Sequence, residues 1–122
     1  MWASDRIFLQ ACVELAAKGQ MTCAPNPPVG CIIWRDGQVL GRGFHARAGS
    51  GHAEVNALIK CDFNNPKPKK MYLTHAPCPV CAKCIVNSGI EQVLYVNDYE
   101  PDMTGVEILR ECDISVIKLV DN

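Results

Sequence analysis

Two short motifs constrain this chain more than any other feature. The first is Pro77-Cys78-Pro79-Val80-Cys81, with two cysteines at C-x-x-C spacing, and the second is His52-Ala53-Glu54. Two thiolates at that spacing lie on one turn or first helical turn, and one imidazole completes three protein ligands for a tetrahedral Zn²⁺. The fourth position then stays open for water. The chain must therefore fold so that His52, Cys78 and Cys81 meet at one metal that does chemistry.

The position of Glu54 indicates how this site is arranged. Glu54 follows His52 by two residues, so the two side chains do not share a helical face. The metal therefore cannot lie alongside the helix, as it does in H-E-x-x-H proteases, and must lie off the helix end. There His52 holds the metal while Glu54 points past it at the bound water.

Length and composition limit the class of protein. The 122 residues predict a single domain over residues 1–122, and the hydrophobic fraction of 48% and charged fraction of 20% are those of an ordinary globular protein. No apolar run approaches the ~18 residues of a membrane span, and Asp5 and Arg6 argue against a signal peptide. Most of the eight cysteines stand singly in apolar runs, which is typical of free thiols in a reducing cytoplasm. Proteins that bind polynucleotides usually carry a positive charge, whereas the net charge here is −1. We therefore expect a small-molecule substrate.

The apolar pattern predicts alternating helices and strands. We expect helices over residues 4–18, 51–60 and 106–112, another beginning at Pro79, and strands over residues 29–34, 38–45, 71–74, 91–96 and 114–120. Asp36-Gly37 is a two-residue hairpin signal between the first two strands. The last strand, short helix and strand predict a parallel crossover. These elements predict a three-layer α/β/α domain with a five-stranded mixed sheet, which starts with a hairpin and ends with parallel strands.

Several residues beside the motifs have two interpretations. Cys84 continues the C-x-x-C spacing and is either a small core residue, which we favour, or a third sulfur ligand. His75 is either held by its backbone geometry, which we favour, or a metal ligand. Lys67, Lys69 and Lys70 form a basic cluster in a loop that we expect to be solvated from residue 62 to 70.

The two motifs together resemble the signature of the zinc-dependent nucleobase deaminases, H-x-E followed by P-C-x-x-C. The resemblance covers nearly the whole chain and implies a cytidine deaminase-like fold and hydrolytic removal of an exocyclic amine from a nucleobase-like ring. In that chemistry Zn²⁺ lowers the pKa of its water towards ~7. Glu54 takes the proton, then protonates the ring nitrogen and the leaving amine. The resemblance also implies that backbone groups of Ala53 and Ala76 read the amide face of the base.

The two halves of the chain resemble different subfamilies. Residues 25–31 and 41–49 are similar to segments of the riboflavin-pathway pyrimidine deaminases, which implies substrate contacts by Asn26 and His45. Spacing alone does not decide whether Asn26 is a site residue or an ordinary turn residue. The P-C-P-x-C-A-K form of the cysteine motif, and the residues from 89 to 109, are similar to deoxycytidylate deaminases. In that half Tyr99 falls at the carboxyl end of a strand, the edge where parallel sheets place ligands.

We predict deamination of a free cytosine nucleotide, dCMP to dUMP with release of ammonia, because the cysteine motif and the crossover match that subfamily. Arg47, or a lysine of the 62–70 loop, would bind the phosphate. The alternative substrate is the riboflavin-pathway phosphoribosyl pyrimidine, although those enzymes separate their metal cysteines by a longer insertion and normally carry a fused reductase.

Alternatives of another class are an interaction module whose structural zinc is closed by Cys84 or His75, and an inactive nucleotide-binding domain. We further expect a homo-oligomer with Zn²⁺ as its cofactor, located in the cytoplasm, with no polynucleotide or membrane partner.

Overall fold

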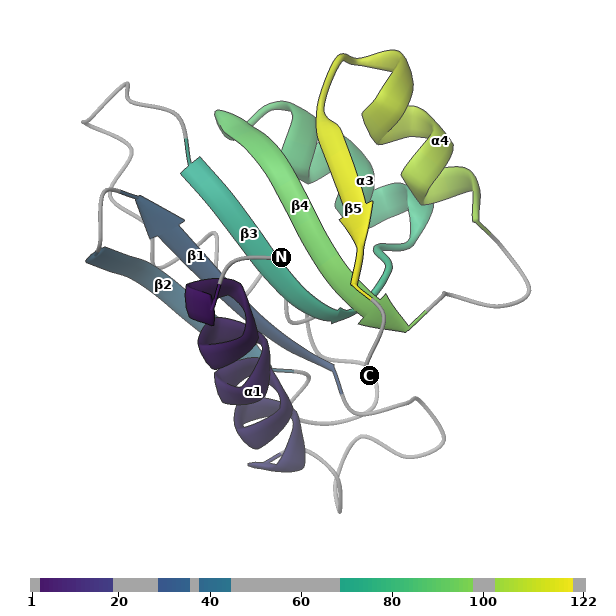
Figure 1. Ribbon diagram of the computed structural model, residues 1–122. Helices are drawn as coiled ribbons and strands as arrows, with labels where there is room; N and C mark the ends of the chain where they lie inside the picture. Colours follow the sequence, from purple (N-terminus) through teal and green to yellow (C-terminus); the bar gives the residue numbers. More distant parts are fainter. Residues whose placement is uncertain (1–2, 19–28, 36–37, 45–68, 98–102, 120–122) are drawn as a thin grey trace.

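The computed structural model describes residues 3–18, 29–35, 38–44, 69–97 and 103–119 (Figure 1). Their elements are α1 (Ala3–Lys18), β1 (Gly30–Arg35), β2 (Gln38–Phe44), β3 (Lys69–His75), α3 (Pro79–Val86), β4 (Ile90–Asn97), α4 (Thr104–Glu111) and β5 (Ser115–Lys118). The described helices and strands confirm the predicted ones, and each begins and ends within two residues of the predicted bounds. The helix predicted over residues 51–60 lies outside the described residues. None of the described helices is long and apolar enough to cross a membrane.

The strands form one five-stranded mixed sheet in the order β2-β1-β3-β4-β5. β1 is antiparallel to β2 and to β3, whereas β3, β4 and β5 are parallel. Arg35 pairs with Gln38, so the hairpin turns over two residues, as Asp36-Gly37 predicts. α4 lies between β4 and β5 in the chain and makes the predicted parallel crossover.

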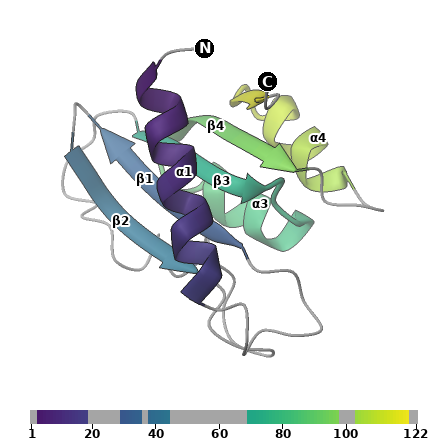
Figure 2. The same cartoon turned by 60° about the horizontal axis from the view of Figure 1, so that its bottom comes forward.

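Helices cover both faces of the sheet, which confirms the three-layer architecture. α1 lies across one face, and α3 and α4 lie on the other (Figures 1 and 2). Successive strand residues alternate between the two faces. The core under α1 contains Ile32, Tyr72 and Leu94 of the sheet. The core under α3 and α4 contains Cys31, Ile33, Met71, Leu73, Val93 and Tyr95 of the sheet.

The buried face of α1 includes a polar residue. Leu9, Cys12 and Ala16 are buried, whereas Ile7 is 67% exposed. Asp5 lies one turn before Leu9 on the buried face, and its Oδ1 accepts a 2.6 Å hydrogen bond from the Tyr72 hydroxyl. A buried carboxylate with such a partner cannot be anticipated from hydropathy, which treats Asp as a surface residue.

β3 begins two residues earlier than expected and includes Lys69 and Lys70. Lys69 is 3% exposed, and Lys70 Nζ lies 5.5 Å from the centroid of the Trp34 ring, a cation–π contact. The expectation of a solvated loop is therefore wrong for these two lysines. The reason is strand pairing, since Lys70 pairs with Trp34 of β1 and Lys69 with Ile90 of β4.

Candidate active site

The two motif cysteines lie at the start of α3, directly after β3. Cys78 is the N-cap residue, with φ −72° and ψ 167°, and Pro79 occupies the first helical turn, where its missing N–H costs nothing. The Cys81 backbone N–H donates to Cys78 Sγ across 3.5 Å. The two side chains are 8% and 1% exposed. The C-x-x-C spacing thus places both sulfur atoms at one buried helix N-terminus.

This arrangement fits half of a zinc site. A helix N-terminus and a backbone N–H are favourable partners for a negative sulfur. Two buried thiolates so close together also need a cation between them. Among the described residues no group of three or more His, Cys, Asp or Glu comes together. The third ligand that the sequence predicts, His52, lies outside the described residues.

Cys84 does not lie where we expected it. Its side chain is exposed on the outer side of α3, so the prediction of a core residue is wrong. The buried stripe of the helix consists of Cys81, Ala82 and Ile85. Cys84 falls outside this stripe because the sheet lies against the side of the helix that carries Ala82 and Ile85.

The loop that carries Cys78 is fixed at the carboxyl ends of β3 and β4. The Ala76 backbone N–H donates to the Asn97 carbonyl at 2.8 Å, and Asn97 Nδ2 donates to the Thr74 carbonyl at 3.0 Å. Parallel sheets place their ligands at this edge. The Ala76 N–H is occupied by its hydrogen bond to Asn97. The contact with a base that we predict for Ala76 would therefore be made by its carbonyl oxygen.

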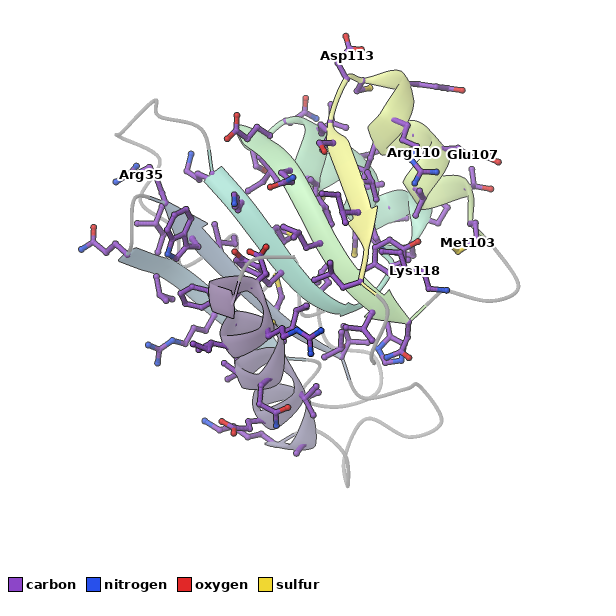
Figure 3. All side chains as sticks on the ribbon, in the orientation of Figure 1. Arg35, Met103, Glu107, Arg110, Asp113 and Lys118 are labelled. Carbon is purple, nitrogen blue, oxygen red and sulfur yellow. The ribbon has the colours of Figure 1, made fainter. Side chains whose placement is uncertain are left out.

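α4 packs against the same loop. A Cβ on Gly105 would lie 2.1 Å from the Pro77 carbonyl oxygen and 3.0 Å from the Cys78 carbonyl. No side chain fits in that space, so Gly105 allows the helix to begin in direct contact with the backbone of the cysteine motif. Figure 3 shows Met103 at the start of this helix and Glu107 on its outer side.

His75 ends β3 and is half-buried, three residues before Cys78. Its Nδ1 lies 3.0 Å from Thr74 Oγ1. Burial lowers the pKa of the imidazole, which keeps the ring neutral at pH 7. Nδ1 is thus engaged within β3, in keeping with the prediction that local geometry holds this side chain.

The structure brings together Cys78, Cys81 and Ala76 of the predicted site. The other predicted site residues lie outside the described ranges: Asn26, His45, Arg47, His52, Ala53, Glu54 and Tyr99. Sequence reasoning missed the supporting roles of Thr74, Asn97 and Gly105. The one available signal was Thr74 itself, a polar residue that ends the apolar run of residues 71–73.

The family model of the cytidine and deoxycytidylate deaminase zinc-binding region matches residues 3–97. The chain belongs to this family. The matched range includes both motifs and extends from α1 to β4. The family is described by its zinc-binding region, which confirms Zn²⁺ as the cofactor.

Curated relatives come from the riboflavin pathway. The riboflavin biosynthesis protein RibD of Haemophilus influenzae is 38% identical over 98% of this chain, which spans 34% of that protein. The diaminohydroxyphosphoribosylamino-pyrimidine deaminase of Buchnera aphidicola subsp. Acyrthosiphon pisum is 36% identical over 87% of this chain and 76% of its own length. The chain therefore spans about a third of the RibD protein but most of the Buchnera deaminase.

Solved structures confirm the cytidine deaminase-like fold. Acinetobacter baumannii RibD matches with a TM-score of 0.87 and 36% identity, over 93% of this chain and 34% of that chain. The dCMP deaminase of cyanophage S-TIM5 matches with a TM-score of 0.80 over 98% of this chain and 100% of that chain. At 24% identity the second similarity shows the fold alone.

Proposed function

We propose that this chain deaminates a phosphoribosylated diaminohydroxypyrimidine, the substrate for which its relatives are named. The observation that carries the proposal is the 36% identity with the Buchnera deaminase over 76% of that protein. A second deaminase of that name, from the Schizaphis graminum subspecies, is also 36% identical, over 82% of its length. The alternative substrate of the sequence analysis thus has better support than dCMP.

The first half of the chain supports the same substrate. Asn26 and His45 lie in the two segments that resemble riboflavin-pathway deaminases. An amide both donates and accepts hydrogen bonds, so Asn26 suits a pyrimidine that carries amino and oxo groups. Arg47 offers a planar fork of donors for the substrate phosphate.

The catalytic steps follow from groups that the chain provides. His52, Cys78 and Cys81 hold the zinc, which supplies an acidified water when bound. Glu54 would take one proton from the attacking water and pass it to the ring nitrogen as the hydroxyl adds to the ring carbon that carries the amine. It would then take the second proton from that hydroxyl and pass it to the amine, which leaves as ammonia while the carbonyl forms. Backbone groups of Ala53 and the Ala76 carbonyl orient the ring.

dCMP is the second candidate because of the cysteine spacing. Two residues separate Cys78 from Cys81, as in the deoxycytidylate deaminases that the motif resembles, whereas riboflavin-pathway enzymes have a longer insertion there. A nucleotide substrate also needs a phosphate ligand. Lys69 is buried within β3, and Lys70 stacks on Trp34, so Arg47 and Lys67 are the candidates.

Ammonia release from a substrate panel tests the proposal. The panel contains the riboflavin-pathway pyrimidine, dCMP, CMP, cytidine, deoxycytidine, cytosine and guanine, each with zinc-loaded protein. We expect kcat/KM for the riboflavin-pathway pyrimidine to exceed that for dCMP by at least ~10². Turnover of dCMP alone would replace the proposal with the second candidate. If no compound reacts, binding of the pyrimidine without turnover identifies an inactive binder, and no binding favours the structural-zinc module.

Three further proposals concern the molecule as a whole. We propose that residues 1–122 act as one deaminase domain, which the single sheet with a core on each face supports. A cytoplasmic location is supported by the cysteines that stand singly in apolar runs of the sequence, such as Cys12 and Cys31. A homo-oligomer stays a prediction, which light scattering of the purified protein tests.

A further inference from the structure

We propose that Thr74 is a positioning residue, whose hydroxyl fixes the first residue of β1 relative to the cysteine loop after β3. The inference rests on the proposed function in one respect, since it takes Asn26 as a substrate ligand. Thr74 lies at the carboxyl end of β3 and is 3% exposed. Its hydroxyl and carbonyl groups bind two different parts of the site.

The hydroxyl of Thr74 holds the first residue of β1. The antiparallel ladder between β1 and β3 ends at the pair Cys31 and Leu73. Beyond this pair the Gly30 N–H donates to Thr74 Oγ1 at 3.1 Å, in place of a backbone carbonyl. The side-chain bond thus extends the attachment of β1 by one residue towards the site.

We expect the position of Gly30 to affect Asn26. On the other side Gly30 lies against α1, where an added Cβ would be 2.0 Å from the Cys12 carbonyl oxygen. Gly30 is therefore held between α1 and the Thr74 hydroxyl. Asn26 precedes it in the sequence by four residues, in a segment with three prolines, each of which restricts φ. We therefore expect a displacement of Gly30 to reach Asn26 along the chain.

The cysteine loop has supports that do not depend on the Thr74 hydroxyl. The Thr74 carbonyl accepts from Asn97 Nδ2, and the Ala76 N–H donates to the Asn97 carbonyl. Cys78 is held further by its N-cap hydrogen bond at the start of α3. Loss of the hydroxyl alone should therefore release Gly30 and leave the cysteines in place.

The buried Thr74 hydroxyl has a neighbour for each of its two hydrogen-bonding roles, as acceptor and as donor. It accepts from the Gly30 N–H, and its own proton needs a buried acceptor. His75 Nδ1, 3.0 Å away, is in position to accept it in the tautomer that carries its proton on Nε2. Valine has the shape of threonine but neither donates nor accepts. Thr74→Val therefore leaves the Gly30 N–H and His75 Nδ1 without partners.

The kinetic test compares Thr74→Val with Thr74→Ser and with Tyr72→Phe. Tyr72→Phe is a matched control, because it removes a buried hydroxyl bond, to Asp5, from the same strand. We expect Thr74→Val to raise KM about tenfold, with kcat within about twofold of the parent and zinc content unchanged. Thr74→Ser should restore the parental KM. Tyr72→Phe should lower Tm and leave KM unchanged.

Each parameter is measured with whichever panel compound releases ammonia, so a wrong substrate assignment does not affect the test. Amide hydrogen exchange gives a readout without turnover, in which Gly30 should exchange faster in Thr74→Val and not in Tyr72→Phe. Thr74→Ala removes the same hydroxyl and replaces the valine variant if that does not fold. A hydroxyl-free variant with parental KM and parental Gly30 exchange would overturn the proposal, and so would one that loses zinc.

Discussion

Glu54 is the single residue whose loss should separate catalysis from metal binding. A general acid and base is not a ligand, so Glu54→Gln should retain one zinc per chain and the parental Tm. Its turnover should fall by ~10²–10⁴. Glu91→Gln makes the same change at an exposed position of β4 and should keep full activity. Metal analysis and ammonia release measure both effects, and parental turnover of Glu54→Gln would show that another group moves the proton.

Cys78 and Cys84 form a matched pair for testing the ligand set. Both are cysteines of the α3 region, but Cys78 is buried at the N-cap and Cys84 is exposed on the helix. Cys78→Ser should abolish stoichiometric zinc binding, whereas Cys84→Ser should bind one zinc as the parent does. X-ray absorption should report two sulfur ligands in the parent. Loss of zinc from Cys84→Ser would instead support the closed, structural site.

The environment of His75 should make stability depend on pH. Burial lowers its pKa from the usual 6.5, so the folded chain stays neutral at this residue while the unfolded chain takes up a proton below that pH. The unfolded state then binds more protons, and this contribution to stability is present above pH 6.5 and lost as pH falls towards the folded pKa.

His75→Asn should therefore show a shallower loss of stability between about pH 7.5 and about pH 5.5. Asparagine has no titratable ring but offers an oxygen near the position of Nδ1, so the acceptor for Thr74 is retained. Urea unfolding of parent and variant at both pH values gives the two slopes. Equal slopes would mean that the burial of this imidazole does not affect its protonation.

At the scale of elements, the start of α4 should be as important for the zinc site as α3 itself. Gly105→Ala places a Cβ 2.1 Å from the Pro77 carbonyl oxygen, and a backbone atom cannot move aside as a flexible side chain does. We expect the variant to lose at least the ~1–3 kcal/mol typical of overpacking. Its zinc affinity should also fall, because the strain is relieved by a shift of the loop that carries Cys78.

Glu107→Ala, on the exposed side of the same helix, is the control for Gly105→Ala. It should bind zinc as the parent does and change stability by less than about 0.5 kcal/mol. Chemical denaturation and competition with a chromogenic zinc chelator measure the two quantities. Parental zinc affinity in Gly105→Ala would show that α4 can move without moving the cysteine loop.

Elements whose signals are local could be predicted from the sequence. Asp36-Gly37 indicates the hairpin, Pro79 marks the first turn of α3, and the strand, helix and strand order predicts the parallel crossover. Positions whose burial depends on a distant partner could not be predicted in this way. Asp5 is buried because of Tyr72, 67 positions away, and Lys69 because β3 pairs with β4 beyond its apolar run. Hydropathy contains no information about such partners.

At the scale of the whole molecule, the metal was more predictable than the substrate. The cysteine spacing alone indicates a metal site, because coordination geometry permits few arrangements. Substrate recognition depends on several segments, and the residues that we propose for it, Asn26, His45 and Arg47, lie well before the cysteines in the sequence. The two halves of the chain also resemble different subfamilies, which is why the sequence favoured dCMP and the relatives favour another pyrimidine.

Removal of zinc should weaken the molecule without unfolding it. The two apolar cores lie on opposite faces of one sheet and contain neither Cys78 nor Cys81. They should form without metal, unlike the core of a zinc finger. A ligand that binds only the folded state adds RT ln(1 + [L]/Kd) of stability, about 4 kcal/mol at a free zinc concentration of about 1,000 Kd. Chelation should therefore lower Tm by more than about 10 °C.

Circular dichroism at about 25 °C should show that the chelated protein retains its helices and strands, and added zinc should restore both Tm and turnover. Glu54→Gln should show the same fall in Tm on chelation, because it retains the metal. Cys78→Ser should start from the lower Tm and not respond to chelator. If chelation removed the helical signal altogether, the metal would be holding the fold itself, and the structural-zinc alternative would account for the cysteines better than the catalytic one.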